Sequence, residues 1–191
     1  DDAVSGYGWN PARAMRLIQA ALPSATHVLD TGNFTVLGEH FLKARTTTSV
    51  IGTPSGRYMG AGLGYALGAS IALPDNPIVL WVGDGGLRTS IGELALAAEQ
   101  GCKLLVIVIK DGYFGSIRGN AMVNELTQVP VTLSERSSLA IAQSMGIDGR
   151  VVRNESDLLQ GLDKWRRDLK PSLFECVVDA DEYIEQAGRL R

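Results

Sequence analysis

The sequence predicts an α/β fold, a three-layer sandwich in which a mostly parallel, doubly wound sheet carries helices on both faces. Strand-like and helix-like segments alternate along the 191 residues. The predicted strands are apolar throughout rather than every second residue, which is typical of parallel strands that are buried on both faces. Glycine is concentrated between positions 52 and 119, which indicates backbone that approaches a ligand closely.

In the first part of the chain, cap and proline signals mark the ends of the helices. Asn10 followed by Pro11 is a favourable cap and first turn, and Pro23 ends the helix. The predicted elements are a helix over 10–22, a strand over 26–29, a helix over 33–42, a short strand over 46–51 and a helix over 58–73. The last helix carries Gly60, Gly64 and Gly68 on one face, which would allow a close approach to a sheet or a ligand.

The second part continues the alternation. Ser90 and Glu93 fit a capping box for a helix that ends at Gln100, with Gly101 as its stop. The remaining predicted elements are buried strands over 78–82 and 103–109, a helix over 133–145, a strand over 150–153, a helix over 156–169 capped by Ser156 and a strand over 172–178. The polar end over 181–191 is either a helix or a frayed polar tail. The length suits one α/β domain, so residues 1–191 are expected to form a single domain.

Composition excludes several classes of protein. Apolar residues make up 45% and charged residues 20%, which is ordinary for a globular protein. The net charge of −3 and the lack of a basic stripe exclude nucleic acid as a partner. No run approaches the ~18 apolar residues of a membrane span, and the start lacks signal-peptide order. Cys102 and Cys176 lie far apart, so two reduced thiols in a cytoplasmic protein are expected.

Two aspartates mark a candidate site at the carboxyl edge of the predicted sheet. Asp84 and Asp111 each follow a buried strand, and they are separated by 27 residues, about one strand–helix–strand crossover. Right-handed crossover geometry places both carboxylates at the same edge, where ligands of such sheets bind. Two hard oxygen ligands suit Mg²⁺ or Ca²⁺, and Mg²⁺ commonly completes its shell with water and phosphate oxygens.

Glycines around the first aspartate extend this interpretation to an anion. Gly83, Gly85 and Gly86 flank Asp84, so backbone N–H groups and the start of the following helix would face a phosphate. The carboxylates alone would repel it, so the metal is essential to a diphosphate site. Taken singly, either turn could be turn chemistry alone. The pattern is neither a P-loop nor a dinucleotide fingerprint, because Asp84 occupies the middle of the Gly-x-Gly.

Gly83-Asp84-Gly85, a helix and a strand, and then Lys110-Asp111-Gly112 resemble the thiamine-diphosphate motif, in which Gly-Asp-Gly precedes a paired Asn-Asn or a close variant. Further segments resemble the same family in order: Asn10 to Leu22, Asp30-Thr31-Gly32, Tyr58-Met59-Gly60 through Leu73-Pro74-Asp75, and Ile117-Arg118. Most of the chain thus resembles the C-terminal thiamine-diphosphate (pyrophosphate-binding) domain of the acetolactate synthase and 2-oxo-acid decarboxylase superfamily.

The resemblance implies a role for each matching residue. Asp84, Asp111 and the backbone carbonyl of Tyr113 would bind Mg²⁺, and apolar Met59 would hold the cofactor in its bent form. From spacing alone, Met59 as a gap-filling core residue remains the alternative. The implied cofactor-binding residues are Gly32, Asn33, Arg57, Met59, Gly83, Asp84, Gly85, Gly86, Asp111, Tyr113, Phe114 and Gly115. Phe114, Ile117 and Arg118 match positions near the substrate.

The sequence also departs from the family pattern. Asp111 stands where Asn is usual and makes the site more negative, which Lys110 would offset. Arg57 stands where Gly is common, near the expected aminopyrimidine. Gly86-Leu87-Arg88 replaces a small polar and aromatic pair. These changes bear on the substrate more than on the cofactor.

The implied activity is decarboxylation of a small 2-oxo acid, or carboligation, with thiamine diphosphate as electron sink. The activating glutamate of the family belongs to a separate pyrimidine-binding domain, and no catalytic residue is predicted here. Glu39, Glu93 and Glu99 suit solvated faces or caps, and His27 and His40 lack a nucleophile partner. The chain is therefore expected to be a fragment, which its start at Asp1 favours, or a small subunit similar to that of sulfopyruvate decarboxylase.

In either case we expect a homo- or hetero-oligomer that is inactive without its pyrimidine-binding domain. Two alternatives remain at this point. The same design could serve as a non-catalytic nucleotide-binding module, like the NADP-binding domain of transhydrogenase, for which no magnesium would be needed. A degenerate domain that only assembles with partners is the other alternative.

Overall fold

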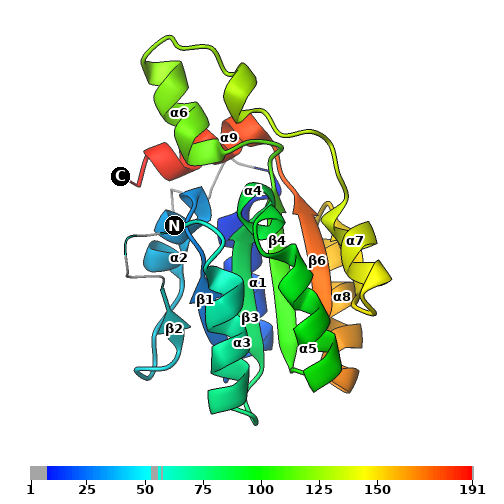
Figure 1. The fold of residues 1–191 in the computed structure, drawn as a ribbon. Coiled ribbons are helices and arrows are strands. Elements are labelled where there is room, and N and C mark those ends of the chain that lie inside the picture. Colours follow the sequence, from blue (N-terminus) through cyan, green and yellow to red (C-terminus); the bar gives the residue numbers. More distant parts are fainter. Residues whose placement is uncertain (1–7, 53–55, 57, 191) are drawn as a thin grey trace.

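The computed structural model describes residues 8–52, 56 and 58–190, which form a six-stranded sheet covered by helices (Figure 1). The strands are β1 (Thr26–Leu29), β2 (Val50–Ile51), β3 (Ile78–Gly83), β4 (Leu104–Lys110), β5 (Asp148–Val152) and β6 (Ser172–Val177). Their order is β2-β1-β3-β4-β6-β5, and each of the five pairings is parallel. The chain runs from β1 to the edge strand β2, crosses to β3 and β4, and reaches the opposite edge at β5 before β6 returns between β4 and β5.

Two apolar layers hold the helices on the sheet. In β3, Val79 and Trp81 face one layer, while Leu80 and Val82 face the other. One face carries α1 (Pro11–Ala21), α2 (Asn33–Phe41) and α8 (Glu155–Asp168). α9 (Ala180–Gly188) adds Tyr183 to the same apolar layer from beyond the end of the sheet (Figure 1). The opposite face carries α3 (Gly62–Ala72), α4 (Asp84–Arg88), α5 (Leu94–Gln100) and α7 (Ser138–Ser144). The strands must be apolar along their whole length, because the side chains that point to either face of the sheet are buried under helices.

The remaining helix lies at one end of the sandwich. α6 (Gly115–Val123) stands beside α9 beyond the carboxyl ends of the central strands (Figure 1). Two 3₁₀ turns, η1 (Ile91–Glu93) and η2 (Val129–Val131), complete the described elements. Within the described ranges, no helix combines the length and hydropathy that a bilayer crossing requires.

Several predicted ends are confirmed. The Asn10 side chain accepts a hydrogen bond of 3.0 Å from the Arg13 amide and caps α1. β1 covers residues 26–29 as predicted. Gly101 ends α5 in the left-handed conformation, with φ of 60°, where a residue without Cβ is favoured.

The region of residues 58–73 differs from its prediction, since α3 begins only at Gly62. Gly60 has φ of +89° and donates its N–H to Asp30, so it belongs to a turn before the helix. The side of α3 that carries Gly64 and Gly68 is open, with nothing within 4 Å of a Cβ built on either residue. The close approach that this glycine spacing predicted is therefore absent from the described chain.

The structure does not form the two helix caps that were predicted at Ser90 and Ser156. The Ser90 hydroxyl donates to the carbonyl of Gly60 at 3.1 Å, so no capping box forms and α5 starts after η1. Asn154 caps α8 by accepting a hydrogen bond from the Asp157 amide at 2.9 Å, in place of Ser156.

Two segments have different extents from those predicted. The helix predicted over 133–145 is confined to α7, and the strand predicted over 46–51 is confined to β2. Of the two alternatives for the polar end, the helix is confirmed: α9 buries Tyr183 and Ala187, which lie four residues apart on one face. No element was predicted for 115–131, which forms α6 and η2.

Candidate functional site

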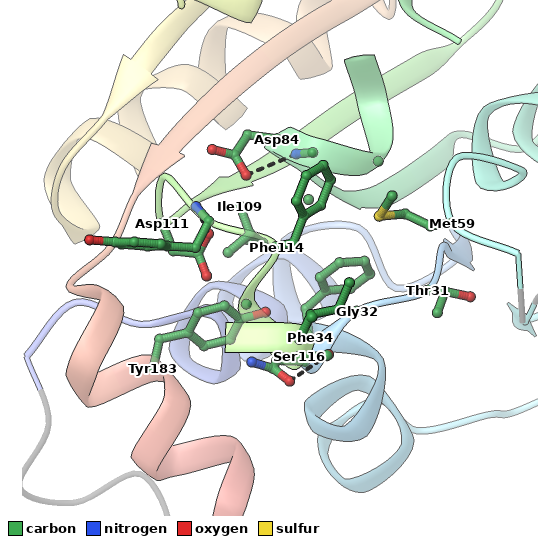
Figure 2. A pocket seen from close by; sticks show the side chains of 17 residues that line it. Thr31, Gly32, Phe34, Met59, Asp84, Ile109, Asp111, Phe114, Ser116 and Tyr183 are labelled. Carbon is green, nitrogen blue, oxygen red and sulfur yellow. Dashed lines mark hydrogen bonds between the residues drawn. The ribbon is translucent and has the colours of Figure 1, made fainter. Parts of the chain in front are cut away.

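The sheet brings the two predicted aspartates together. β3 and β4 are neighbours in register, so Asp84 and Asp111 follow them at the same edge. Asp84 accepts a hydrogen bond from the Gly85 amide at 2.9 Å and another from the Gly112 amide at 3.1 Å. The second bond joins the turn after β3 directly to the turn after β4. Figure 2 shows the side chains of Asp84 and Asp111 beside the same cavity.

Burial makes both carboxylates costly to ionise without a cation. The pKa of Asp84 is raised by burial, against which the amides of Gly112 and Gly85 act. The pKa of Asp111 is raised to about 7, chiefly by burial and also by the charge of Asp84, while the hydrogen bond from the Tyr113 amide acts in the opposite direction. Among the described residues, no three His, Cys, Asp or Glu side chains gather to hold a metal. A cation here needs oxygen ligands beyond these two carboxylates.

The backbone of Tyr113 supplies such an oxygen. Tyr113 and Thr132 form an antiparallel bridge, and its flanking bonds run from Phe114 N–H to the Val131 carbonyl and from Leu133 N–H to the Gly112 carbonyl. In this arrangement the N–H and C=O of Tyr113 itself point away from Thr132. The N–H donates to Asp111 at 3.0 Å, so the carbonyl faces the same side as that carboxylate.

Glycines keep the space beside the carboxylates free of side chains. A Cβ on Gly85 would lie 2.7 Å from the Phe114 ring, and one on Gly115 would lie 2.6 Å from the Asp111 carboxylate. The amino-terminal ends of α2 and α6 also border this space, at Asn33 and Gly115. Backbone amides and positive helix ends beside two carboxylates fit a diphosphate that is bridged by a divalent cation.

A buried aspartate positions Met59 at the rim. Asp30 accepts hydrogen bonds from the Gly60 amide at 2.8 and 3.0 Å and from the Gly62 amide at 3.0 Å. Burial raises the pKa of Asp30, while these amides lower it. Met59 directly precedes Gly60, whose position in the turn the Asp30 hydrogen bonds fix. Its side chain is 40% exposed and borders the cavity (Figure 2). This exposure argues against its interpretation as a gap-filling core residue.

The predicted site residues line one cavity of about 210 Å³. This volume is below the roughly 300–1,000 Å³ of sites that enclose a whole drug-sized ligand, so it suits part of a cofactor. The predicted residues on its wall are Gly32, Asn33, Met59, Gly83, Asp84, Gly85, Gly86, Asp111, Tyr113, Phe114 and Gly115. Arg57 lies outside the described residues.

Several lining residues were absent from the predicted cofactor site. They are Thr31, Phe34, Ile109, Ser116, Ile117 and Tyr183. The strand-end rule could have found Thr31 and Ile109. The Ser116 hydroxyl donates to the Asn33 side chain at 2.8 Å and ties α6 to α2. No local signal marks Tyr183, because α9 reaches the site only through the fold.

Other candidates lie away from the cavity. Lys110 forms an ion pair with buried Glu175, although its charge also lowers the pKa of Asp84. His27 is buried, accepts a hydrogen bond from the Trp81 indole at 3.1 Å, and has a pKa lowered to about 4 by burial. His40 bonds the Val36 carbonyl on the surface. Neither histidine borders the cavity, in line with the prediction.

We expect Gly60→Ala to disrupt the Met59 turn. Its Cβ would lie 1.9 Å from the Thr89 hydroxyl, and φ of +89° is unfavourable for alanine. A loss of at least about 1–3 kcal/mol of unfolding free energy is expected from such strain, measured by chemical denaturation. Gly64→Ala is the matched control, since it lies in α3 with open space and should stabilise by roughly 0.5–1 kcal/mol. Equal effects of the two substitutions would contradict the assigned turn.

Fold and site together define an α/β domain with a phosphate-type cofactor site at the carboxyl edge of a parallel sheet. Residues 30–176 match the sequence model of the thiamine pyrophosphate enzyme family, C-terminal TPP binding domain. The chain belongs to this family. It is a thiamine-diphosphate-binding domain of the acetolactate-synthase-like and 2-oxo-acid decarboxylase enzymes.

Individual relatives agree with this assignment. The chain is 28% identical over 179 residues to a sulfoacetaldehyde acetyltransferase of Roseovarius nubinhibens, which covers 90% of this chain and 30% of the relative. It is 28% identical over 128 residues to the acetolactate synthase large subunit of Lactococcus lactis, covering 66% of this chain and 22% of that subunit.

A solved structure agrees as well. The thiamine diphosphate-dependent 4-hydroxybenzoylformate decarboxylase of Rhodococcus jostii superposes with a TM-score of 0.85 at 25% identity, covering 95% of this chain and 35% of that protein. The chain thus spans no more than 35% of the length of these three relatives.

Proposed function

We propose that this chain binds the diphosphate of thiamine diphosphate through Mg²⁺, as part of a 2-oxo-acid decarboxylase or carboligase. The observation that carries the proposal is the pair of carboxylates of buried Asp84 and half-buried Asp111, each of which accepts a backbone hydrogen bond from the turn after β4, with the Tyr113 carbonyl on the same side. These three oxygens fit Mg²⁺, whose remaining positions water and phosphate oxygens usually fill.

The residues of the chain hold and orient the cofactor. When bound, thiamine diphosphate supplies the electron sink for cleavage beside a carbonyl group. The amide of Gly86 and the start of α2 at Gly32 and Asn33 would face the diphosphate. The amide of Gly85 donates to Asp84 at 2.9 Å, so it would hold the metal ligand in place. Met59 would support the bent cofactor, and its backbone would meet the aminopyrimidine. The same contact is expected of Arg57, which lies outside the described residues. Gly83, Phe114 and Gly115 complete the wall of the cavity.

A pyrimidine-binding domain, in the same or another chain, would complete the site and supply the activating glutamate. The small cavity supports this, since part of the cofactor is left for another surface to cover. α3 supports association into an oligomer, because it has no charged residue and leaves Tyr65 39% and Ile71 71% exposed. We further propose a small 2-oxo acid as substrate and a cytoplasmic location, which the free, buried thiols of Cys102 and Cys176 support.

Calorimetric titration of thiamine diphosphate into the chain tests the proposal. Binding is expected with Mg²⁺ and is expected to be lost with EDTA, because the carboxylates repel the diphosphate without the cation. NADPH serves as the comparison ligand, since a nicotinamide nucleotide needs no magnesium. Binding of thiamine diphosphate that is unchanged by EDTA, or binding of NADPH alone, would contradict the proposal.

A further inference from the structure

Arg118, on α6, is a buried charge outside the cavity wall. Its side chain donates from Nε to Gln128 at 2.9 Å and from Nη2 to Asp181 at 2.7 Å. Its guanidinium carbon lies 4.1 Å from the centre of the Tyr113 ring. One side chain therefore joins the turn after β4, the loop before η2 and the start of α9.

Burial of the Arg118 guanidinium in this position lowers the stability of the fold. Arg118 is only 8% exposed, and its Nη1 is buried without a hydrogen-bond partner within the described part of the chain. Burial of a guanidinium that keeps an unsatisfied donor is unfavourable compared with an apolar side chain of similar volume. A role in holding the Tyr113 turn, Gln128 and the start of α9 together would explain why a charged side chain occupies this buried position.

The segments that Arg118 joins carry two walls of the cavity. Tyr113, under the guanidinium, directs its carbonyl toward the side of Asp111. Asp181 lies two residues before Tyr183, whose ring borders the cavity from α9 (Figure 2). α9 also packs against α2 and α6, and the two helices α6 and α9 lie together above the sheet (Figure 1).

We propose that Arg118 is a positioning residue of the metal and diphosphate site. It keeps the Tyr113 carbonyl directed at the cation and seats α9, with Tyr183, as a wall of the cavity. This inference rests on the proposed function, because the cation gives the Tyr113 carbonyl its task. Arg118 lies over the Tyr113 ring and outside the wall of the described cavity, and its predicted place near the substrate stays a prediction.

Hydrogen–deuterium exchange of the chain without ligands tests whether Arg118 holds the Tyr113 turn and the start of α9 in place. Arg118→Met is expected to raise exchange in residues 112–118 and 180–188, and to leave β3 and β4 unchanged. Asp181→Asn removes only the charge on the α9 side, so it should raise exchange in 180–188 alone. Arg13→Met is the matched control, because Arg13 forms an exposed ion pair with Glu155 on the other part of the fold.

Magnesium titration at fixed thiamine diphosphate tests the positioning role. Arg118→Met is expected to raise the Mg²⁺ concentration for half-maximal binding at least about 10-fold, while Arg118→Lys, which keeps the charge, restores part of it. Exchange that rises evenly through the sheet, or an unchanged Mg²⁺ requirement, would overturn the inference and leave Arg118 with a stabilising role only. A wild-type chain that binds no cofactor would contradict the proposed function. The exchange measurement would still show whether Arg118 holds the Tyr113 turn and α9 in place.

Discussion

Loss of the Asp84 carboxylate is expected to abolish most of the Mg²⁺-dependent binding of thiamine diphosphate. Removal of one partner of a buried charged interaction typically costs about 2–5 kcal/mol, or roughly 30-fold to several thousand-fold in affinity. Asp84→Asn is the better variant than Asp84→Ala, because its one amide oxygen can still accept one of the two bonds that Gly85 and Gly112 donate to the separate carboxylate oxygens. The measurement is calorimetric titration at saturating Mg²⁺.

The control for this result is a carboxylate outside the site. Asp148 is exposed and pairs with Lys164 at 2.7 Å, so Asp148→Asn should bind cofactor like the wild type. If Asp84→Asn also binds like the wild type, Asp84 is not a metal ligand and the site is only a structural turn. If both variants lose binding, general loss of negative charge rather than ligation is responsible.

Asp111→Asn is expected to stabilise the metal-free chain, with the largest gain above neutral pH. The pKa of Asp111 is raised to about 7 in the folded chain, from 3.8, chiefly by burial. The folded state therefore binds its proton more tightly than the unfolded state does. The resulting stabilisation is present below about pH 4 and is lost as pH rises to about 7, so the ionised group then costs roughly 4 kcal/mol at most.

Urea unfolding in EDTA at several pH values measures this effect. The unfolding free energy of the wild type should fall relative to Asp111→Asn between about pH 4 and 7, and the two curves should then run parallel. Mg²⁺ with thiamine diphosphate should reduce the difference, since the cation compensates the carboxylate. The variant should still bind cofactor, because Asn is the usual residue of the resembled family here. A constant difference across this pH range would contradict an ionised, uncompensated Asp111.

The location of the acidic site followed from rules that act over short stretches of chain. Apolar strands ending in Gly83-Asp84 and Lys110-Asp111, one crossover apart, place both carboxylates at one sheet edge without knowledge of any other residue. The role of the Tyr113 carbonyl rested on the family resemblance alone. The bridge to Thr132 gives its orientation a physical cause, and that bridge joins segments whose pairing no sequence pattern indicated.

The failures share a different cause. Ser90 has the right neighbours for a capping box, but the distant Gly60 carbonyl takes its hydroxyl. Gly60 fits a helical spacing, yet buried Asp30 holds it in a turn. In both places a partner about 30 residues away outweighs a local preference of about 1 kcal/mol.

The sequence by itself determined the alternation of elements, the parallel sheet and the edge that carries Asp84 and Asp111, because period, caps and crossover handedness are local properties. Tertiary structure alone decided that Tyr183 of α9 forms a wall of the cavity and that Arg118 lies over the Tyr113 ring, outside the cavity wall. These placements depend on packing between segments more than 60 residues apart, as in the Arg118–Asp181 pair. Packing is set by the shape and charge of the assembled surfaces, and no window of sequence contains them.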